Sequence, residues 1–287
     1  MKLKLMRWTG GKYRMTQIIN PLMPECSEYY EPFLGSGAVL LNKCRTEKEI
    51  VNDLDEDLYK LHTVLADHDK MTELLNRLDK HPVNEETFIQ AKECLDKKPE
   101  ERVGMDEIEV ARCKYTIVEL SYNALGKNYS DCSKDRFIRD AHYYFPKICA
   151  RYQGVEFRKG DGIELIARVK DNPDAFVFAD PPYDHKTRGN KKIYKCEMWD
   201  AAQKKMLETL KNAKCKIMLC GYADENGDDM YDQALLPLGW KRYELTRIVQ
   251  SCQNKEKKDI AVEYIWVNYE LPEVASSYIN MSTKKVA

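Results

Sequence analysis

The sequence lacks any apolar run long enough to cross a lipid bilayer. A membrane-spanning helix needs about 20 mostly apolar residues in succession. Charged side chains, which make up 32% of the 287 residues, break every apolar stretch before that length. The opening segment MKLKLMRWTGGK also lacks the apolar stretch of a secretory signal. We therefore expect a cytoplasmic protein without a membrane segment.

Cysteine pairs with metal-ligand spacing are absent as well. The ten cysteines are scattered between Cys26 and Cys252 without a single Cys-x-x-Cys pair, and the five histidines show no ligand spacing. This pattern argues against a disulfide framework and predicts no metal site. Charge of one sign does not dominate either, since 46 basic residues stand against 47 acidic ones. Binding to nucleic acid would therefore have to use local basic patches.

The apolar pattern predicts an open α/β sheet that is interrupted by a helical segment. Residues 27–31 and 49–52 have the composition of strands, and between them a glycine loop leads into an apolar helix beginning at Ala38. This succession is typical of a βαβ unit. From about residue 56 to residue 122 the apolar spacing is helical. Further strands are expected at residues 154–157, 175–179, 215–220, 242–249 and 260–268.

The tetrapeptide Asp180-Pro181-Pro182-Tyr183 directly follows the apolar strand AFVFA. Ligands of open α/β sheets bind at this end of the strands. The two prolines stiffen the turn, so the Asp180 carboxylate and the Pro181 carbonyl could accept hydrogen bonds from one amino group. Tyr183 would offer a flat face to a planar base. The alternative is an ordinary strand-ending turn with a buried tyrosine.

A second candidate is the loop from Glu31 to Gly37, with the sequence EPFLGSG. Its glycines let the backbone approach a ligand, and the start of the following helix favours polar or anionic groups. Asp53, at the end of the next strand, is placed to accept hydrogen bonds from ribose hydroxyls. A tight turn without a ligand is the alternative. Leu40 stands where the dinucleotide motif G-x-G-x-x-G has its third glycine, which argues against a nicotinamide oxidoreductase.

The third candidate is the segment RWTGGK at residues 7–12. Trp8 could pack against an adenine or a sulfonium by cation–π attraction, and Lys12 could reach a carboxylate. The alternative is a buried tryptophan beside a solvated lysine.

Together, RWTGGK, EPFLGSG, VNDLD and DPPY resemble, in this order, the motifs of the Dam-type adenine-specific DNA methyltransferases. The segment after DPPY and the closing EYIWVNY are similar to those of phage and restriction-system members. The resemblance implies an α/β fold: a Rossmann-like methyltransferase sheet with helices on both faces, interrupted by a mostly helical target-recognition domain. It implies a catalytic domain at residues 1–58 and 151–287 and the recognition domain at residues 59–150.

The resemblance also implies a reaction and the residues that perform it. S-adenosylmethionine would be the methyl donor, and an adenine flipped out of double-stranded DNA would be the acceptor. The catalytic residues would be Asp180, Pro181, Pro182 and Tyr183. The cofactor would be bound by Trp8, Lys12, Glu31, Phe33, Gly35, Ser36, Gly37, Asp53, Asp161 and Asp180.

Two polar, partly basic segments are candidates for DNA contacts. One is LGKNYSDCSKDRF at residues 125–137, and the other follows DPPY, where residues 184–216 hold ten basic side chains against four acidic ones. Ordinary solvated loops would have the same composition. The residues expected to contact DNA are Asn123, Lys127, Asn128, Lys134, Arg136, Arg139, Arg188, Lys191 and Lys192.

Other interpretations stay open on the sequence alone. The same turn could present acceptors to the amine of cytosine, to an adenine of RNA or to a glutamine amide, and a catalytically silent DNA-binding protein could keep the fold. Membership of a restriction-modification pair would add a cognate restriction endonuclease as partner.

Overall fold

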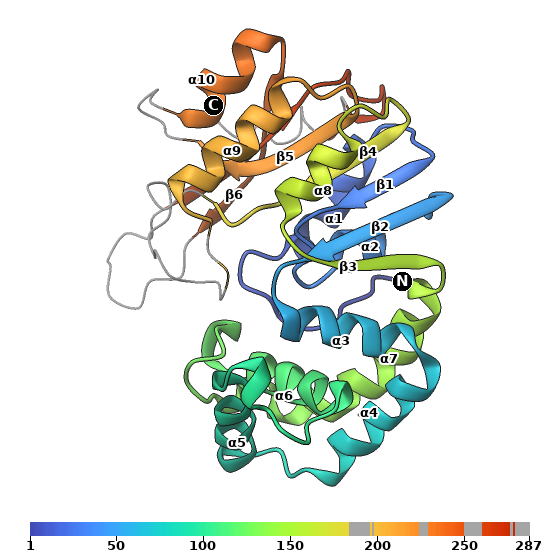
Figure 1. Ribbon diagram of the computed structural model, residues 1–287, viewed down its shortest axis with the longest axis vertical. Helices are drawn as coiled ribbons and strands as arrows, with labels where there is room; N and C mark the ends of the chain where they lie inside the picture. The colour runs from blue at the N-terminus through green and yellow to red at the C-terminus, as the bar shows by residue number, and fades with distance from the viewer. Residues whose placement is uncertain (184–195, 197, 224–228, 250–259, 276–277, 279–287) are drawn as a thin grey trace. The chain divides into compact units, whose positions relative to one another are not determined.

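Strands and helices alternate along the chain as in an α/β protein. The computed structural model describes residues 1–183, 196, 198–223, 229–249, 260–275 and 278. Its sheet has seven strands in the order β3-β2-β1-β4-β5-β7-β6 (Figure 1). The strands are β1 (Glu28–Glu31), β2 (Lys48–Asp53), β3 (Val155–Lys159), β4 (Ala175–Ala179), β5 (Lys216–Tyr222), β6 (Lys241–Val249) and β7 (Ile260–Val267). Each strand expected from the sequence is confirmed.

The sheet combines a parallel and an antiparallel part. β2, β1, β4 and β5 pair in parallel, whereas β7 runs antiparallel to both β5 and β6. All five residues of β4 are buried, as expected for a central parallel strand. Because Glu28 of β1 pairs with Ala175 of β4, the carboxyl ends of these strands lie side by side. Asp180 follows β4 directly at this edge of the sheet.

Contacts within the chain group its elements into two compact units. The first comprises Met1–Arg14, Leu34–Lys43 and Asn52–Gly160, and the second comprises Met15–Phe33, Cys44–Val51 and Asp161–Ala287. The α-helices are α1 (Thr16–Ile19), α2 (Ala38–Asn42), α3 (Glu56–Ala66), α4 (His68–Lys80), α5 (Glu85–Asp96), α6 (Glu107–Glu119), α7 (Phe137–Tyr152), α8 (Gly162–Val169), α9 (Asp200–Lys211) and α10 (Met230–Leu235). The 3₁₀ helices are η1 (Lys12–Met15), η2 (Asn20–Leu22), η3 (Pro99–Glu101), η4 (Tyr122–Ala124), η5 (Asp131–Arg136) and η6 (Leu236–Leu238).

The helical segment of the first unit is built from α3 to α7 (Figure 1). α6 packs against α3, α4 and α5, while α7 packs against α3 and α4. Side chains of Asp67, Asn84 and Asp106 begin α4, α5 and α6 by accepting hydrogen bonds from backbone N–H groups of the first turn. The helical spacing predicted for α3 is confirmed by the burial of Leu58, Leu61, Val64 and Leu65.

In the second unit, α8, α9 and α10 cover one face of the sheet. Ile166 of α8, Met206 of α9 and Leu235 of α10 join Val177 and Ile217 of the strands in one buried cluster. Burial of such side chains is the main source of stability for a layered domain.

The opposite face of this part of the sheet carries aromatic rings. Side chains alternate along a strand, so Phe176 points away from its neighbour Val177. Its ring lies near those of Tyr29 and Tyr269, and Tyr269 donates a hydrogen bond to the carbonyl of Leu22 in η2. Within the described ranges, no helix is both long and apolar enough to cross a membrane.

Candidate functional site

The glycine loop after β1 is held to the end of β2 by hydrogen bonds. Gly35 and Gly37 adopt φ values of 53° and 66°, a conformation that residues with a side chain rarely adopt. The Gly35 N–H donates to Asp53 Oδ2 over 2.8 Å, and the N–H of Asp55 donates to Asp53 Oδ1 over 2.9 Å. The Asp53 carboxylate therefore fixes the loop through both of its oxygens.

A buried histidine of α3 holds the same loop from its other side. His62 Nε2 lies 2.8 Å from the Gly35 carbonyl, and Nδ1 lies 2.8 Å from the hydroxyl of Tyr152. Because a carbonyl can only accept, Nε2 carries the hydrogen and Nδ1 accepts from Tyr152. Burial lowers the pKa of His62 to about 4. The ring is therefore neutral at physiological pH, and this chain of hydrogen bonds has one direction.

Two charged side chains beside this loop are Asp53 and Lys114. Burial raises the pKa of Asp53 to about 6, although the backbone N–H groups of Asp55 and Gly35 act in the opposite direction. The buried ammonium of Lys114 lies 2.6 Å from Asp55 Oδ2 and 5.7 Å from the centre of the Trp8 ring. A cation on α6 thus lies next to the aromatic face that the sequence assigns to a ligand.

Trp8, Lys12 and Ser36 also belong to this cluster. A side chain at Gly35 would come within 3.0 Å of the Trp8 indole nitrogen, so the ring lies directly against the loop. Ser36 and Lys12 are buried, and the Lys12 ammonium donates to the Gly10 carbonyl over 3.0 Å. The first unit therefore brings together six of the residues predicted to bind the cofactor: Trp8, Lys12, Gly35, Ser36, Gly37 and Asp53.

Three of the four predicted cofactor residues of the second unit lie near the carboxyl end of β1 and the start of α8, and the fourth, Asp180, follows β4. Glu31 is buried and accepts a hydrogen bond from the Tyr29 hydroxyl over 2.7 Å. Phe33 packs on Gly162, where an added Cβ would lie 2.6 Å from its ring. The preceding Asp161 begins α8 by accepting from the Ile163 N–H over 2.9 Å. This capping bond accounts for Asp161 even without a ligand.

The turn after β4 brings two carboxylates to one phenol. The Tyr183 hydroxyl lies 3.0 Å from Asp180 Oδ1 and is also hydrogen-bonded to Oε1 of Glu263 on β7. Tyr183 is buried, and its ring meets that of Tyr222 edge to face with 4.7 Å between the centres. Asp180 remains partly exposed.

A glutamine of α9 fixes the backbone of this turn. Gln203 is fully buried, and its amide nitrogen donates to the Pro182 carbonyl over 2.7 Å. The amide oxygen of Gln203 accepts from the Tyr231 hydroxyl over 2.7 Å. The turn is therefore positioned by the helix layer as well as by its two prolines.

Three predicted DNA-contacting residues, Asn123, Lys127 and Asn128, lie on a closed loop after α6. The N–H of Tyr122 donates to the Asn128 carbonyl, and the N–H of Gly126 donates to the buried Ser121 hydroxyl. Of the candidates in the helical segment, five are exposed: Asn123, Lys127, Asn128, Lys134 and Arg139.

Two basic candidates of the helical segment already have side-chain partners within the chain. Arg136 is half-buried and donates to the Ser133 hydroxyl over 3.1 Å. Arg139, although exposed, lies 3.3 Å from Asp140. Arg188, Lys191 and Lys192 lie outside the described residues.

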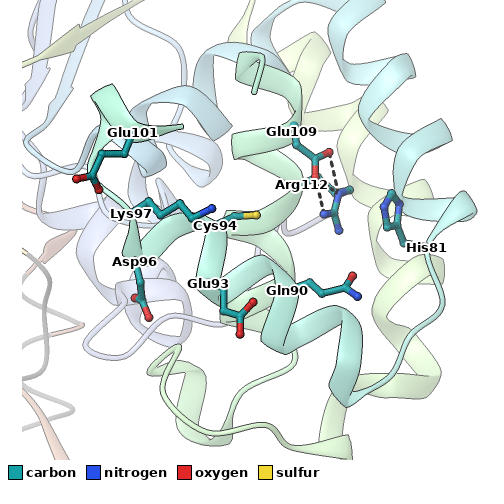
Figure 2. Close-up of a pocket in the computed structure, with 9 residues that line it drawn as sticks. All are labelled: His81, Gln90, Glu93, Cys94, Asp96, Lys97, Glu101, Glu109 and Arg112. Carbon is teal, nitrogen blue, oxygen red and sulfur yellow. Dashed lines mark hydrogen bonds and ion pairs between the residues drawn. The ribbon is translucent and has the colours of Figure 1, made fainter. Parts of the chain in front are cut away.

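A cavity of about 770 Å³ lies between helices of the first unit, where it is lined by α5, α6 and the segments beside them (Figure 2). Figure 2 shows Arg112 paired with Glu109 at one end, and Nε and Nη2 make the contacts. None of the residues predicted to bind cofactor or DNA lines it. Its acidic side chains outnumber its basic ones, which makes it a poor site for DNA phosphates. The lining residues are His81, Gln90, Glu93, Cys94, Asp96, Lys97, Glu101, Glu109 and Arg112.

The sheet and the two motif loops define a class of enzyme. Residues 8–245 match the D12 class N6 adenine-specific DNA methyltransferases, and the chain belongs to this family. Enzymes of this class transfer a methyl group from S-adenosylmethionine to the N6 amine of adenine in DNA. The fold, the methyl donor and the class of reaction expected from the motifs are therefore confirmed.

Individual relatives of this chain are also named as methyltransferases or as a DNA adenine methylase. A Type II methyltransferase of Lactococcus lactis subsp. cremoris is 27% identical over 195 residues, which cover 62% of this chain and 64% of that protein. A Type II methyltransferase of Methanocaldococcus jannaschii is 25% identical over 295 residues, covering 92% of this chain and 98% of that protein. A DNA adenine methylase of Escherichia coli is 26% identical over 186 residues, covering 62% and 64% respectively. The aligned part thus spans slightly less than two thirds of the Lactococcus and Escherichia relatives.

The first unit suits the methyl donor of this class. Asp53 supplies a partly exposed acceptor for hydroxyl groups, Trp8 a flat aromatic face and Lys12 a positive charge. These are the chemical groups that a nucleoside with an amino-acid tail requires.

Sequence reasoning missed four residues that hold these loops: His62, Lys114, Gln203 and Glu263. A histidine on the apolar face of α3 is a local signal that could have drawn attention to His62. The partners of Lys114, Gln203 and Glu263 lie far away in the sequence, and no local pattern indicates them.

Proposed function

We propose that this chain is a site-specific DNA methyltransferase that methylates adenines extruded from double-stranded DNA in the cytoplasm. The observation that carries the proposal is the Asp180–Tyr183 turn at the end of β4, where a partly exposed carboxylate stands beside a fixed aromatic ring. Family membership supports the same reaction.

S-adenosylmethionine supplies an electrophilic methyl group when it is bound. We assign its binding to the glycine loop with Trp8, Lys12 and Asp53, because the backbone of this loop is fixed by Asp53 and His62 before a ligand arrives. The full proposed set is Trp8, Lys12, Glu31, Phe33, Gly35, Ser36, Gly37, Asp53, Asp161 and Asp180.

The exocyclic amine of adenine is a weak nucleophile because its lone pair is delocalised into the ring. Acceptance of its two hydrogens by the Asp180 carboxylate and the Pro181 carbonyl would localise that lone pair. Pro182 keeps the turn rigid, and Gln203 anchors its carbonyl. Tyr183 would replace part of the stacking that the extruded base loses.

DNA recognition is assigned to residues 59–150, and residues 1–58 and 151–287 are assigned to catalysis. Exposure of Asn123, Lys127 and Asn128 on a loop closed by hydrogen bonds supports a role in contacting DNA. The other proposed contacts are Lys134, Arg136, Arg139, Arg188, Lys191 and Lys192.

A cognate restriction endonuclease is the proposed biological partner. The support is that relatives in Lactococcus and Methanocaldococcus are Type II methyltransferases. Methylation of adenines in a short DNA sequence would then protect that sequence from the nuclease.

The experiment is transfer of labelled methyl from S-adenosylmethionine to unmethylated double-stranded DNA, followed by digestion to nucleosides and chromatography. We expect label in N6-methyl-2′-deoxyadenosine, and sequencing of the product gives the recognition site. Label in a methylated deoxycytidine would contradict the adenine assignment, and label in a parallel reaction with RNA but not with DNA would contradict the DNA assignment. Cofactor binding without any transfer would favour a silent DNA-binding protein.

A further inference from the structure

The Tyr183 hydroxyl has one hydrogen and two carboxylate neighbours. Asp180 Oδ1 lies 3.0 Å away, and Glu263 Oε1 is the closer partner. Tyr183 is 7% exposed and Glu263 only 2%. Since carboxylates can only accept when ionised, the hydroxyl can donate to one of them at a time. The other contact becomes a hydrogen bond only if that carboxyl group carries a proton.

The positions of these groups are set by the sheet. Glu263 of β7 pairs directly with Tyr222 of β5, and residues opposite each other in an antiparallel pair point to the same face. Tyr222 in turn packs edge to face on Tyr183. Glu263 is therefore held beside the turn by the hydrogen-bonded ladder.

Burial raises the pKa of Tyr183 well above its usual range. Its hydroxyl consequently stays protonated and does not act as an anion. A neutral hydroxyl between two carboxylates can accept a proton from one while donating its own hydrogen to the other.

We propose that Glu263 receives the proton that the adenine amine releases, through Asp180 and the Tyr183 hydroxyl. The inference rests on the proposed function. As the adenine nitrogen gains its methyl group, one of its N–H bonds breaks and the proton goes to the Asp180 carboxylate. Asp180 then passes a proton to the Tyr183 oxygen, and the Tyr183 hydrogen moves to Glu263. Asp180 is ionised again, Tyr183 is unchanged and Glu263 is protonated.

Isosteric variants of the full-length protein test this relay. Glu263→Gln keeps the size and the acceptor oxygen but cannot take a proton, whereas Glu263→Asp keeps the carboxylate. Tyr183→Phe removes the hydroxyl and keeps the ring. Glu270→Gln is the control, because this glutamate just beyond β7 is exposed and pairs with Lys241.

The measurements are single-turnover methyl transfer to duplex DNA in H₂O and D₂O, and calorimetric binding of S-adenosylmethionine. Because positioned acid–base groups contribute typically 10²–10⁴-fold, we expect Glu263→Gln to lower the rate by about 100-fold. We expect its solvent isotope effect to exceed that of the wild type, since proton transfer becomes the slow step. Cofactor affinity should stay unchanged, and Glu263→Asp should regain part of the rate.

A second readout uses the double variant. If Tyr183 and Glu263 form one relay, Tyr183→Phe combined with Glu263→Gln should be no slower than the slower single variant. A wild-type rate and isotope effect in Glu263→Gln would overturn the relay, and so would equal losses in Glu263→Gln and Glu263→Asp, which indicate packing alone. Absence of adenine methylation by the wild type would instead overturn the proposed function.

Discussion

The glycine loop of the first unit and the Asp180–Tyr183 turn of the second unit use carboxylates in opposite ways. At the glycine loop, the Asp53 oxygens each accept a backbone N–H and the Gly35 carbonyl is held by neutral His62. At the turn, two carboxylates share one hydroxyl hydrogen. The hydrogen bonds of Asp53 fix the backbone conformation of the glycine loop. At the turn, the hydroxyl hydrogen can point to either Asp180 or Glu263.

This difference assigns binding to one region and chemistry to the other. A loop whose polar groups are fixed in advance loses little freedom when a ligand binds. A partly exposed carboxylate that contacts a neutral hydroxyl can accept hydrogen bonds from an amine and then its proton. Substitutions in the two regions should therefore change different measured quantities.

The largest effect is expected at the turn. Asp180→Ala removes an acceptor for the adenine amine and should lower methyl transfer by roughly 1,000-fold or more, as loss of a key polar group does in other active sites. Although Asp180 belongs to the proposed cofactor set, the fixed glycine loop carries most of that binding, so affinity for S-adenosylmethionine should fall far less than in Asp53→Ala. Labelled methyl transfer and calorimetry on the same preparation check both statements. Retention of methyl transfer would contradict the assignment of the chemistry to this turn.

Asp53→Ala should instead weaken cofactor binding. Loss of hydrogen bonds to a charged group costs about 1.5–3 kcal/mol, which corresponds to a dissociation constant raised roughly 10- to 100-fold. Calorimetry with S-adenosylmethionine measures this directly. Asp69→Ala, at an exposed carboxylate of α4, is the control and should bind as the wild type does.

His62→Gln tests the fixed loop through the pH dependence of stability. Because burial lowers the pKa of His62 from 6.5 to about 4, the unfolded chain takes up a proton before the folded one does. The stability that the neutral ring contributes is present above pH 6.5 and is lost as the pH falls towards 4. At about 1.4 kcal/mol per pH unit, the loss is of the order of 3 kcal/mol.

Asp53 acts in the opposite sense over nearly the same range. Its pKa is raised from 3.8 to about 6, so its contribution to stability is present below pH 3.8 and is lost as the pH rises through 6. The two effects partly cancel in the wild type. Denaturant unfolding of wild type and His62→Gln between pH 4 and 7 should therefore show a difference that shrinks towards acid pH. A constant difference would show that His62 is not a buried neutral ring.

The smallest effect is expected at Gln203, which supports the turn without belonging to it. Gln203→Leu leaves the Pro182 carbonyl and the Tyr231 hydroxyl without this partner. The free energy of unfolding should fall by about 2 kcal/mol, and turnover should fall at unchanged cofactor affinity. Gln90→Leu, at an exposed side chain of α5, should shift stability by less than about 0.5 kcal/mol. Equal shifts in the two variants would contradict the positioning role.

Local sequence patterns predicted the elements better than the contacts between them. The buried β4 is visible as the uninterrupted apolar run AFVFA, and the helical apolar spacing from about residue 56 to residue 122 corresponds to α3 to α6. The loops that follow β1 and β4 were predicted from the glycines of EPFLGSG and the prolines of DPPY. These residues mark turns through their own backbone preferences, which are local as well.

Residues that support these loops were hidden because their partners are distant along the chain. His62 lies 27 residues from Gly35, and Glu263 lies 80 residues from Tyr183. The second contact depends on β7 pairing with β5. Single-sequence periodicity carries no information on strand order of that kind.

Methyl transfer at saturating S-adenosylmethionine tests the division between binding and chemistry most directly. Asp53→Ala and Asp180→Ala would each be loaded with enough cofactor to fill the site, and a single turnover on duplex DNA would be followed. The account predicts that Asp53→Ala approaches the wild-type rate while Asp180→Ala stays inactive. A slow Asp53→Ala at full occupancy, or an active Asp180→Ala, would contradict it.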